Sequence, residues 1–255
     1  MTDWHVHIGQ WHEIYYDPAA VVRALASSGT DEFWFSSTSS CRYCKESAAV
    51  QDKRDLWESL PTARELYECI KGEVENALVA AKDCGVRAHP LYWVIPEVHF
   101  SSDAGITVEN AMSEISYEGF KLHPRGNPWD LDNPQTLSLA HEVFSYAQKC
   151  DFPILIHAGP DPFELPSLFT PLIVAYPSVT VQLAHCRPLE DVLAMLRKFP
   201  NVVCDTAFAD EKTVREIRAA GFGKRIRHGT DFPITHYRAV RPNHDPTEAG
   251  MTAQR

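Results

Sequence analysis

Short apolar segments alternate along the chain with longer segments of helical periodicity. Runs such as 153–157 are apolar at consecutive positions, which is typical of strands buried on both faces of a parallel sheet. Eight strands are predicted: Trp4–Ile8, Glu32–Ser36, Val86–Val94, Gly119–His123, Pro153–His157, Thr180–His185, Val202–Asp205 and Arg225–Gly229. Their centres recur at intervals of roughly 20 to 35 residues, the length of a strand–helix–strand unit, with one longer interval after the second strand.

The clearest helix lies between the second and third predicted strands. Thr62 and Glu65 form a capping-box motif, in which each side chain can bond to the backbone N–H of the other. An apolar stripe at helical spacing follows, and Gly85 is a typical helix end. The three stripes expected to face the core are Leu66, Ile70, Val74, Leu78 and Ala81; Leu137, Ala140, Phe144 and Ala147; and Val192, Leu193, Leu196 and Phe199.

Eight strand–helix units in 255 residues predict a (β/α)8 barrel of the TIM type, formed as a single domain over residues 1–255. A doubly wound open sheet is the alternative for the same pattern. Few residues follow Asp231, and Pro233, Pro242 and Pro246 interrupt them. Because proline disrupts helix interiors, the last helix of the barrel is expected to be irregular or missing.

Charge and composition limit the partners of such a barrel. The chain has 34 acidic and 24 basic residues and a formal net charge of −10, which argues against a nucleic-acid partner because phosphate binding depends on Lys and Arg. No apolar run approaches the roughly 18 residues of a membrane helix, and the first residues lack the features of a signal peptide. The seven cysteines are irregularly spaced, so reduced thiols in a soluble cytoplasmic protein are expected. Homo-oligomerisation is left open.

Four histidines and one aspartate stand at the C-terminal ends of predicted strands, where barrel active sites form. His5 and His7 are two residues apart on the first strand, so both side chains project to one face. His157, His185 and Asp231 follow the fifth, sixth and eighth strands. Since the eighth and first strands are neighbours in a closed barrel, these side chains are expected to converge. Imidazole and carboxylate ligands favour zinc or a similar divalent cation with an open coordination position.

This pattern resembles the metal-dependent amidohydrolase superfamily, and within it the branch of amidohydrolase-related barrels that includes aromatic-acid decarboxylases. The resemblance spans residues 3 to 233 and rests on Asp3-x-His5-x-His7, on Lys121-Leu122-His123-Pro124, on His157 and His185, and on Gly229-Thr230-Asp231-Phe232-Pro233. It implies that His5, His7, His157 and Asp231 bind a metal and that Asp231 takes the proton of the attacking water. It implies that His185 either binds a second ion or polarises the substrate carbonyl.

The resemblance leaves Lys121 with two alternative roles. In some members of the superfamily a lysine at the end of the fourth strand is carbamylated and bridges two metals. Otherwise Lys121 would bond to the substrate or to a neighbouring carboxylate. One or two ions are therefore expected. Four further residues near the mouth are candidates for substrate binding, the arginines as clamps for a carboxylate and the tryptophan as an apolar wall: Arg125, Arg187, His123 and Trp129.

Together with the resemblance, these features predict a metal-dependent hydrolase that cleaves an ester, lactone or amide of a small molecule. A divalent cation lowers the pKa of bound water to about 7. Asp231 would accept the proton, and the metal or His185 would stabilise the oxyanion. Two alternatives stay open: metal-dependent non-oxidative decarboxylation of an aromatic or unsaturated acid, and a metal-binding barrel without catalytic activity.

Overall fold

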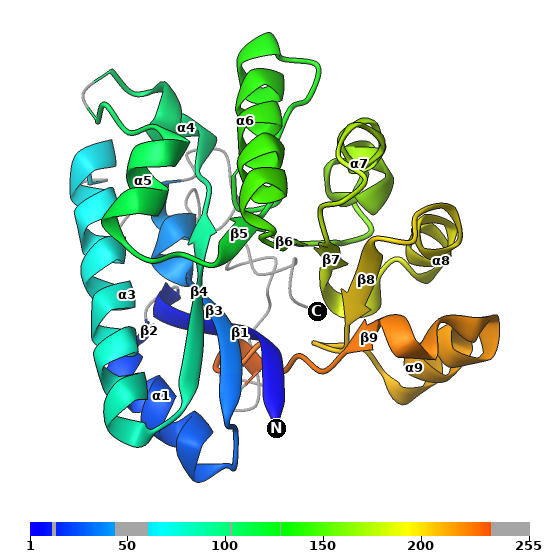
Figure 1. The fold of residues 1–255 in the computed structure, drawn as a ribbon, viewed down its shortest axis with the longest axis horizontal. Helices are drawn as coiled ribbons and strands as arrows, with labels where there is room; N and C mark the ends of the chain where they lie inside the picture. The colour runs from blue at the N-terminus through cyan, green and yellow to red at the C-terminus, as the bar shows by residue number, and fades with distance from the viewer. Residues whose placement is uncertain (12–13, 44–60, 103, 128, 236–255) are drawn as a thin grey trace.

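A curled nine-stranded sheet forms the centre of the protein in the computed structural model, which describes residues 1–11, 14–43, 61–102, 104–127 and 129–235 (Figure 1). The strands are β1 (Thr2–Trp11), β2 (Ile14–Tyr16), β3 (Glu32–Ser37), β4 (Arg87–Trp93), β5 (Gly119–Leu122), β6 (Ile154–Ile156), β7 (Val181–Leu183), β8 (Val202–Asp205) and β9 (Ile226–Arg227). β1 pairs in parallel with β3, and from β3 to β9 each strand pairs in parallel with the next one along the chain. This sequential order is that of a (β/α)8 barrel and excludes the doubly wound sheet, in which the strand order reverses.

One strand was not expected from the sequence. β2 pairs antiparallel with the end of β1, from Gly9 opposite Tyr16 to Trp11 opposite Ile14. It is three residues long, below the length at which period-2 alternation becomes readable. The hairpin extends β1 beyond the barrel on the side where the strands end.

The ring closes where β1 meets residues 228–232, a contact that we call the seam. Three backbone hydrogen bonds cross it: Trp4 N–H to the His228 carbonyl (2.8 Å), Asp231 N–H to the His5 carbonyl (2.8 Å) and His7 N–H to the Phe232 carbonyl (2.7 Å). Because β9 has only two regular residues, fewer than the predicted strand Arg225–Gly229, the barrel is incomplete at its last unit. The segment in which the last helix was doubted, after residue 235, lies outside the described residues.

Helices follow the strands and lie along the outside of the sheet, from α1 and α3 at one edge to α8 and α9 at the other (Figure 1). They are α1 (Pro18–Ser27), α3 (Ala63–Cys84), α4 (Pro96–Phe100), α5 (Val108–Glu114), α6 (Pro134–Cys150), α7 (Thr170–Ala175), α8 (Leu189–Lys198) and α9 (Glu211–Ile217). The capping box at the start of α3 is confirmed, with the Thr62 side chain bonded to Glu65 N–H and the Glu65 carboxylate to Thr62 N–H. Gly85 ends this helix in the left-handed conformation, with φ of 69°. In the described part of the chain, no helix combines the length and apolar character needed to span a bilayer.

The two faces of the sheet carry different side chains. Outward-facing residues such as Phe33, Phe35 and Phe120 are completely buried in the main apolar cluster, which the sheet shares with the helices. Inside the ring a smaller cluster joins Leu91 and Leu155 to neighbouring apolar groups. The period-2 alternation of the strands therefore sends apolar residues to the helices and leaves inward positions for chemistry. That the chain forms one domain stays a prediction.

A stack of flat side chains occupies the N-terminal end of the ring interior. The Trp4 ring stacks on Trp34, with centroids 5.1 Å apart and planes at 9°, and Trp34 stacks on His89 at 4.4 Å. On the other face of Trp4, the Arg227 guanidinium carbon lies 3.8 Å from the ring centroid. We call Arg227, Trp4, Trp34 and His89 the aromatic column. It occupies the end of the barrel opposite to the one where β1, β5 and β6 present their histidines and lysine.

Candidate metal centre

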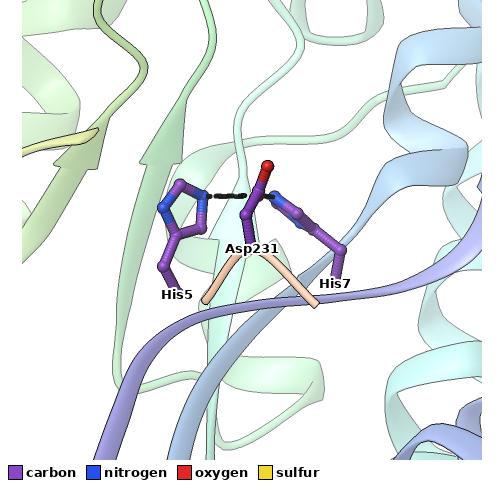
Figure 2. A group of neighbouring side chains, drawn as sticks. All are labelled: His5, His7 and Asp231. Atoms are coloured by element: carbon purple, nitrogen blue, oxygen red, sulfur yellow. Dashed lines mark hydrogen bonds and ion pairs between the residues drawn. The ribbon is translucent and has the colours of Figure 1, made fainter. Parts of the chain in front are cut away.

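Three buried side chains from the two sides of the seam meet inside the barrel. β1 supplies His5 and His7, and the segment after β9 supplies Asp231. Figure 2 shows the two rings turned toward the Asp231 carboxylate from either side. The Nε2 atoms of His5 and His7 lie 3.3 and 2.9 Å from Asp231 Oδ1 and 3.2 Å from each other. We call these three residues the ligand cluster, because their ligand atoms all lie within 4.8 Å of one another.

Local backbone features bring these residues together. The register of β1 against β3 shifts between Asp3 and Val6, at the position of His5. Across the seam, the Asp3 carboxylate accepts hydrogen bonds from the N–H and the hydroxyl of Thr230, which fixes the turn before Asp231. Asp231 itself has φ of 55°, a left-handed conformation that non-glycine residues adopt mainly at constrained sites. A Cβ at Gly229 would lie 2.9 Å from that of His5, so only glycine permits this close approach.

The positions of the ring protons decide what the cluster can bind. His7 Nδ1 lies 3.3 Å from the carbonyl oxygen of Ser36, which can only accept a hydrogen bond, and 3.2 Å from the Ser36 hydroxyl, which can donate or accept. A proton on His7 Nδ1 satisfies both contacts. His5 Nδ1 lies 3.1 Å from Asp205 Oδ2, a carboxylate oxygen that also accepts, so the proton of His5 is on Nδ1. Both Nε2 atoms therefore direct lone pairs toward Asp231, whose oxygens receive no hydrogen bond from the described residues. Three buried acceptors that face one another fit a bound cation.

The charges around the cluster set its ionisation. Burial alone would raise the pKa of Asp231, but positive charge on the His5 and His7 rings, when they are protonated, and on Lys121 holds it below its usual value. Burial lowers the pKa of His7, against the opposing effect of Asp231. At neutral pH the cluster thus offers a carboxylate and neutral imidazole, which are the forms that bind metals.

Lys121 lies next to the ligand cluster on β5. Its Nζ is 3.4 Å from His5 Nε2 and 5.7 Å from the centroid of the Trp93 ring. Burial lowers the pKa of Lys121 to about 8, although Asp231 and Asp205 oppose the effect. A neutral amine is therefore accessible at mildly alkaline pH. The carbamylation of Lys121 stays a prediction.

His157 and His185 form a second pair of rings beside the cluster. His185 Nε2 lies 3.1 Å from His157 Nδ1, and its Nδ1 lies 3.2 Å from the Ala207 carbonyl, which requires a proton on Nδ1. His157 Nε2 lies 3.2 Å from Glu164 Oε2. Burial lowers the pKa of both rings well below the usual range of histidine. The structure thus places His157 beside the ligand cluster and not within it, and ligation by His157 and His185 stays a prediction.

The two predicted substrate-binding arginines already have partners in the protein. Arg125 is paired with the carboxylates of Asp161 and Glu164, both on the loop after β6. Arg187 donates from Nε to the Ala158 carbonyl at 3.1 Å. Both side chains lie near the C-terminal ends of the strands, and their contact with a substrate stays a prediction.

His123 and Trp129 occupy different environments. The His123 ring stacks between Trp93 and His157, at centroid distances of 4.8 and 4.0 Å, while its Nδ1 accepts a hydrogen bond from Gly126 N–H at 2.7 Å. It therefore both faces the ring interior and caps the turn after β5. Trp129 is buried in the main apolar cluster. The binding of substrate by either residue stays a prediction.

Sequence analysis missed two carboxylates that contact the predicted histidines. Asp205, the last residue of β8, bonds to His5, and it carried the same signal as the others: a polar residue at the end of an apolar strand. Glu164 bonds to His157 but lies in a short turn after β6, where no periodicity marks it. Its Oε2 would lie 1.9 Å from a Cβ at Gly159, so the glycine makes room for the carboxylate.

A barrel with histidines and an aspartate at the C-terminal ends of its strands is typical of metal-dependent enzymes. A family model described as Amidohydrolase matches residues 2–248, and the chain belongs to this family. Among proteins with curated descriptions, none matches the chain.

Solved structures share the fold at low sequence identity. A TatD-like protein from Archaeoglobus fulgidus has a TM-score of 0.54 at 14% identity, with 99% of this chain and 90% of that chain covered. A dihydroxybenzoic acid decarboxylase from Polaromonas sp. with bound manganese has a TM-score of 0.52 at 12% identity, covering 99% and 93%. A phosphotriesterase homology protein from Escherichia coli, complexed with phosphate in its active site, has a TM-score of 0.54 at 10% identity, covering 98% and 94%. These similarities support the barrel and leave the reaction open.

Proposed function

We propose that this protein is a metal-dependent hydrolase that cleaves an ester, lactone or amide of a small molecule. The observation that carries the proposal is the ligand cluster, in which His5 Nε2, His7 Nε2 and Asp231 Oδ1 lie within 3.3 Å of one another. Zinc as the metal and a cytoplasmic location are part of the proposal, and the oligomeric state is left open.

When bound at such a site, a divalent cation acts as a Lewis acid and makes water a nucleophile at neutral pH. Asp231 is the proposed general base, because its carboxylate is ionised and Oδ2 receives no hydrogen bond from the described residues. Because the proton of His185 is on Nδ1, its Nε2 atom carries a lone pair. This tautomer favours His185 as a ligand of a second ion over His185 as a donor to a carbonyl.

The surroundings favour an uncharged substrate. Arg125 is one of the two predicted clamps for a carboxylate, and its charge is balanced by Asp161 and Glu164. An anionic substrate would have to compete with both carboxylates for this guanidinium. An ester, lactone or amide meets no such competition. This argument favours hydrolysis over decarboxylation, whose substrate is an acid.

Metal analysis combined with a two-channel assay tests the proposal. The protein would be purified without chelator, analysed for divalent metals, stripped, and reloaded with zinc or manganese. Acid release would be followed with panels of esters, lactones and amides, and carbon dioxide release with aromatic and unsaturated acids. We expect one or two metal equivalents, and acid release that is lost with chelator and restored by metal.

Other results would contradict the proposal in different ways. Carbon dioxide release without acid release would replace the hydrolase with a decarboxylase. Bound metal without turnover in either panel would favour the non-catalytic metal-binding barrel. Failure to bind any divalent ion would remove the basis of the hydrolase, of the decarboxylase and of the non-catalytic metal-binding barrel.

A further inference from the structure

The Asp205 carboxylate is completely buried and bonded on every side. Oδ2 accepts from His5 Nδ1 at 3.1 Å and from Gln182 Nε2 at 2.8 Å. Oδ1 accepts from the backbone N–H groups of His185 and Ala207, each at 3.1 Å. A carboxylate has about four acceptor positions, and here donors fill all of them. Although His5, His185 and Asp205 also place possible ligand atoms within 4.8 Å of one another, every acceptor position of Asp205 is already taken by a donor of the protein.

Gln182 is held in one orientation. Its Nε2 donates to Asp205 Oδ2 and to the Trp4 carbonyl, at 2.8 and 3.2 Å, while its Oε1 accepts from Arg227 at 2.9 Å. A flipped amide would place Oε1 against two acceptors and Nε2 against a cation. The Arg227 guanidinium thus fixes which end of Gln182 faces Asp205.

Arg227 is anchored in turn by the aromatic column. Its guanidinium carbon lies 3.8 Å from the centroid of the Trp4 ring, which stacks on Trp34. This contact restricts the arginine more than a hydrogen bond alone would. A continuous polar path therefore runs from the aromatic column through Arg227, Gln182 and Asp205 to His5.

We propose that Arg227, Gln182 and Asp205 form a positioning relay that keeps the proton of His5 on Nδ1 and its Nε2 lone pair directed at the ligand cluster. The proposal rests on the proposed function in that it takes His5 to be a metal ligand. None of the three relay residues is among the proposed ligands His5, His7 and Asp231, and Asp205 reaches the site through its hydrogen bond to His5. They act through the tautomer and the orientation of the His5 ring, as outer carboxylates do at other histidine metal sites.

Asp205→Asn tests the relay most directly. The new amide can turn an N–H group toward His5 Nδ1, which then accepts and forces the proton onto Nε2. We expect the affinity for zinc, measured by competition with a chelator, to fall by about 10- to 100-fold. In a long-range proton–nitrogen NMR spectrum of the metal-free protein, His5 should change tautomer, whereas His7, held by Ser36, should not.

Two further variants make the test decisive. Gln182→Met removes the partner of both Asp205 and Arg227 while keeping a similar shape, and it should weaken zinc binding by less than Asp205→Asn does. If Asp205→Asn does not fold, this variant carries the test. Asp210→Asn is the matched control, because Asp210 only caps α9 through Thr213 N–H and should leave affinity and tautomer unchanged.

The outcomes separate the relay from the proposed function. Wild-type affinity and an unchanged His5 tautomer in Asp205→Asn would overturn the relay, and so would wild-type affinity in Gln182→Met where the first variant is not folded. A wild-type protein that binds no zinc would overturn the proposed function, yet the His5 tautomer in the metal-free variants would still report on the relay.

Discussion

The aromatic column and the ligand cluster occupy opposite ends of the same ring of strands and differ in how their polar atoms are paired. In the column, Arg227 donates to Gln182, and the two ring nitrogens of His89 face Glu32 and Glu118 at 3.0 and 2.7 Å. The exception is Trp34, whose indole N–H is buried without a partner among the described residues. Stacked planes and paired charges make this end a stabilising part of the fold.

At the other end, acceptors face acceptors. His5 and His7 approach Asp231 with lone pairs, and Asp231 is held in a left-handed backbone conformation. Such an arrangement destabilises the metal-free fold, and a cation would relieve it. The contrast indicates that stability and chemistry are assigned to different ends of one ring. Function then requires a site that the metal-free protein holds at some loss of stability.

The largest expected effect comes from Asp231→Asn. Loss of the general base and of one ligand should lower kcat/KM by about 100- to 10,000-fold. The new amide can donate to the facing Nε2 atoms, so the unfolding free energy of the metal-free protein should rise by about 1 kcal/mol. Steady-state kinetics and urea unfolding measure the two effects. Lower stability of the metal-free variant would contradict the proposed contrast between the two ends.

At the column, Trp34→Ala should act mainly on stability. Trp34 stacks on two partners, so its removal should lower the unfolding free energy by about 3 kcal/mol. Trp34 reaches the relay only through Trp4, so zinc affinity of the folded variant should change less than in Asp205→Asn. Trp34→Phe, which keeps a stacking ring, is the control. A large loss of affinity in Trp34→Ala with normal folding would show that the two ends are not separate.

Metal loading should stabilise the protein through the ligand cluster. At a free zinc concentration 100 times the Kd, the unfolding free energy should increase by about 2.7 kcal/mol. Thermal unfolding with and without zinc measures this increase. It should persist in Trp34→Ala and disappear in Asp231→Asn. An equal increase in all three proteins would place the zinc elsewhere.

The smallest effect is expected for Glu118→Gln, at the edge of the column. Glu118 pairs with His89 but is 45% exposed, so solvent screens the pair. The loss should be about 0.5 kcal/mol and should shrink at high salt. Urea unfolding at two salt concentrations checks it. A loss as large as that of Trp34→Ala would mean that charge pairing, and not stacking, holds this end together.

Much of the fold could be predicted because it depends on local patterns. Apolar runs marked the parallel strands to within a few residues, and the Thr62–Glu65 motif and Gly85 marked the two ends of α3. The seam was harder to foresee, because Gly229 and Thr230 act through contacts with β1, more than 200 residues earlier in the chain.

The candidate site also has one part that the sequence predicts and another part that it does not. His5, His7 and Asp231 converge because strand order and period-2 alternation together specify their positions. The orientation of the His157 ring could not be predicted, because it depends on Glu164, whose position is set by a loop. Loops lack the periodicity from which geometry can be inferred, so their contacts appear only in three dimensions.

The three hydrogen bonds of the seam have a consequence for biosynthesis. Two of the proposed ligands are made more than 220 positions before the third. A nascent chain therefore cannot assemble the site until Asp231 has left the ribosome. Ion capture would then follow synthesis of the seam and would join two segments that the ribosome makes at different times.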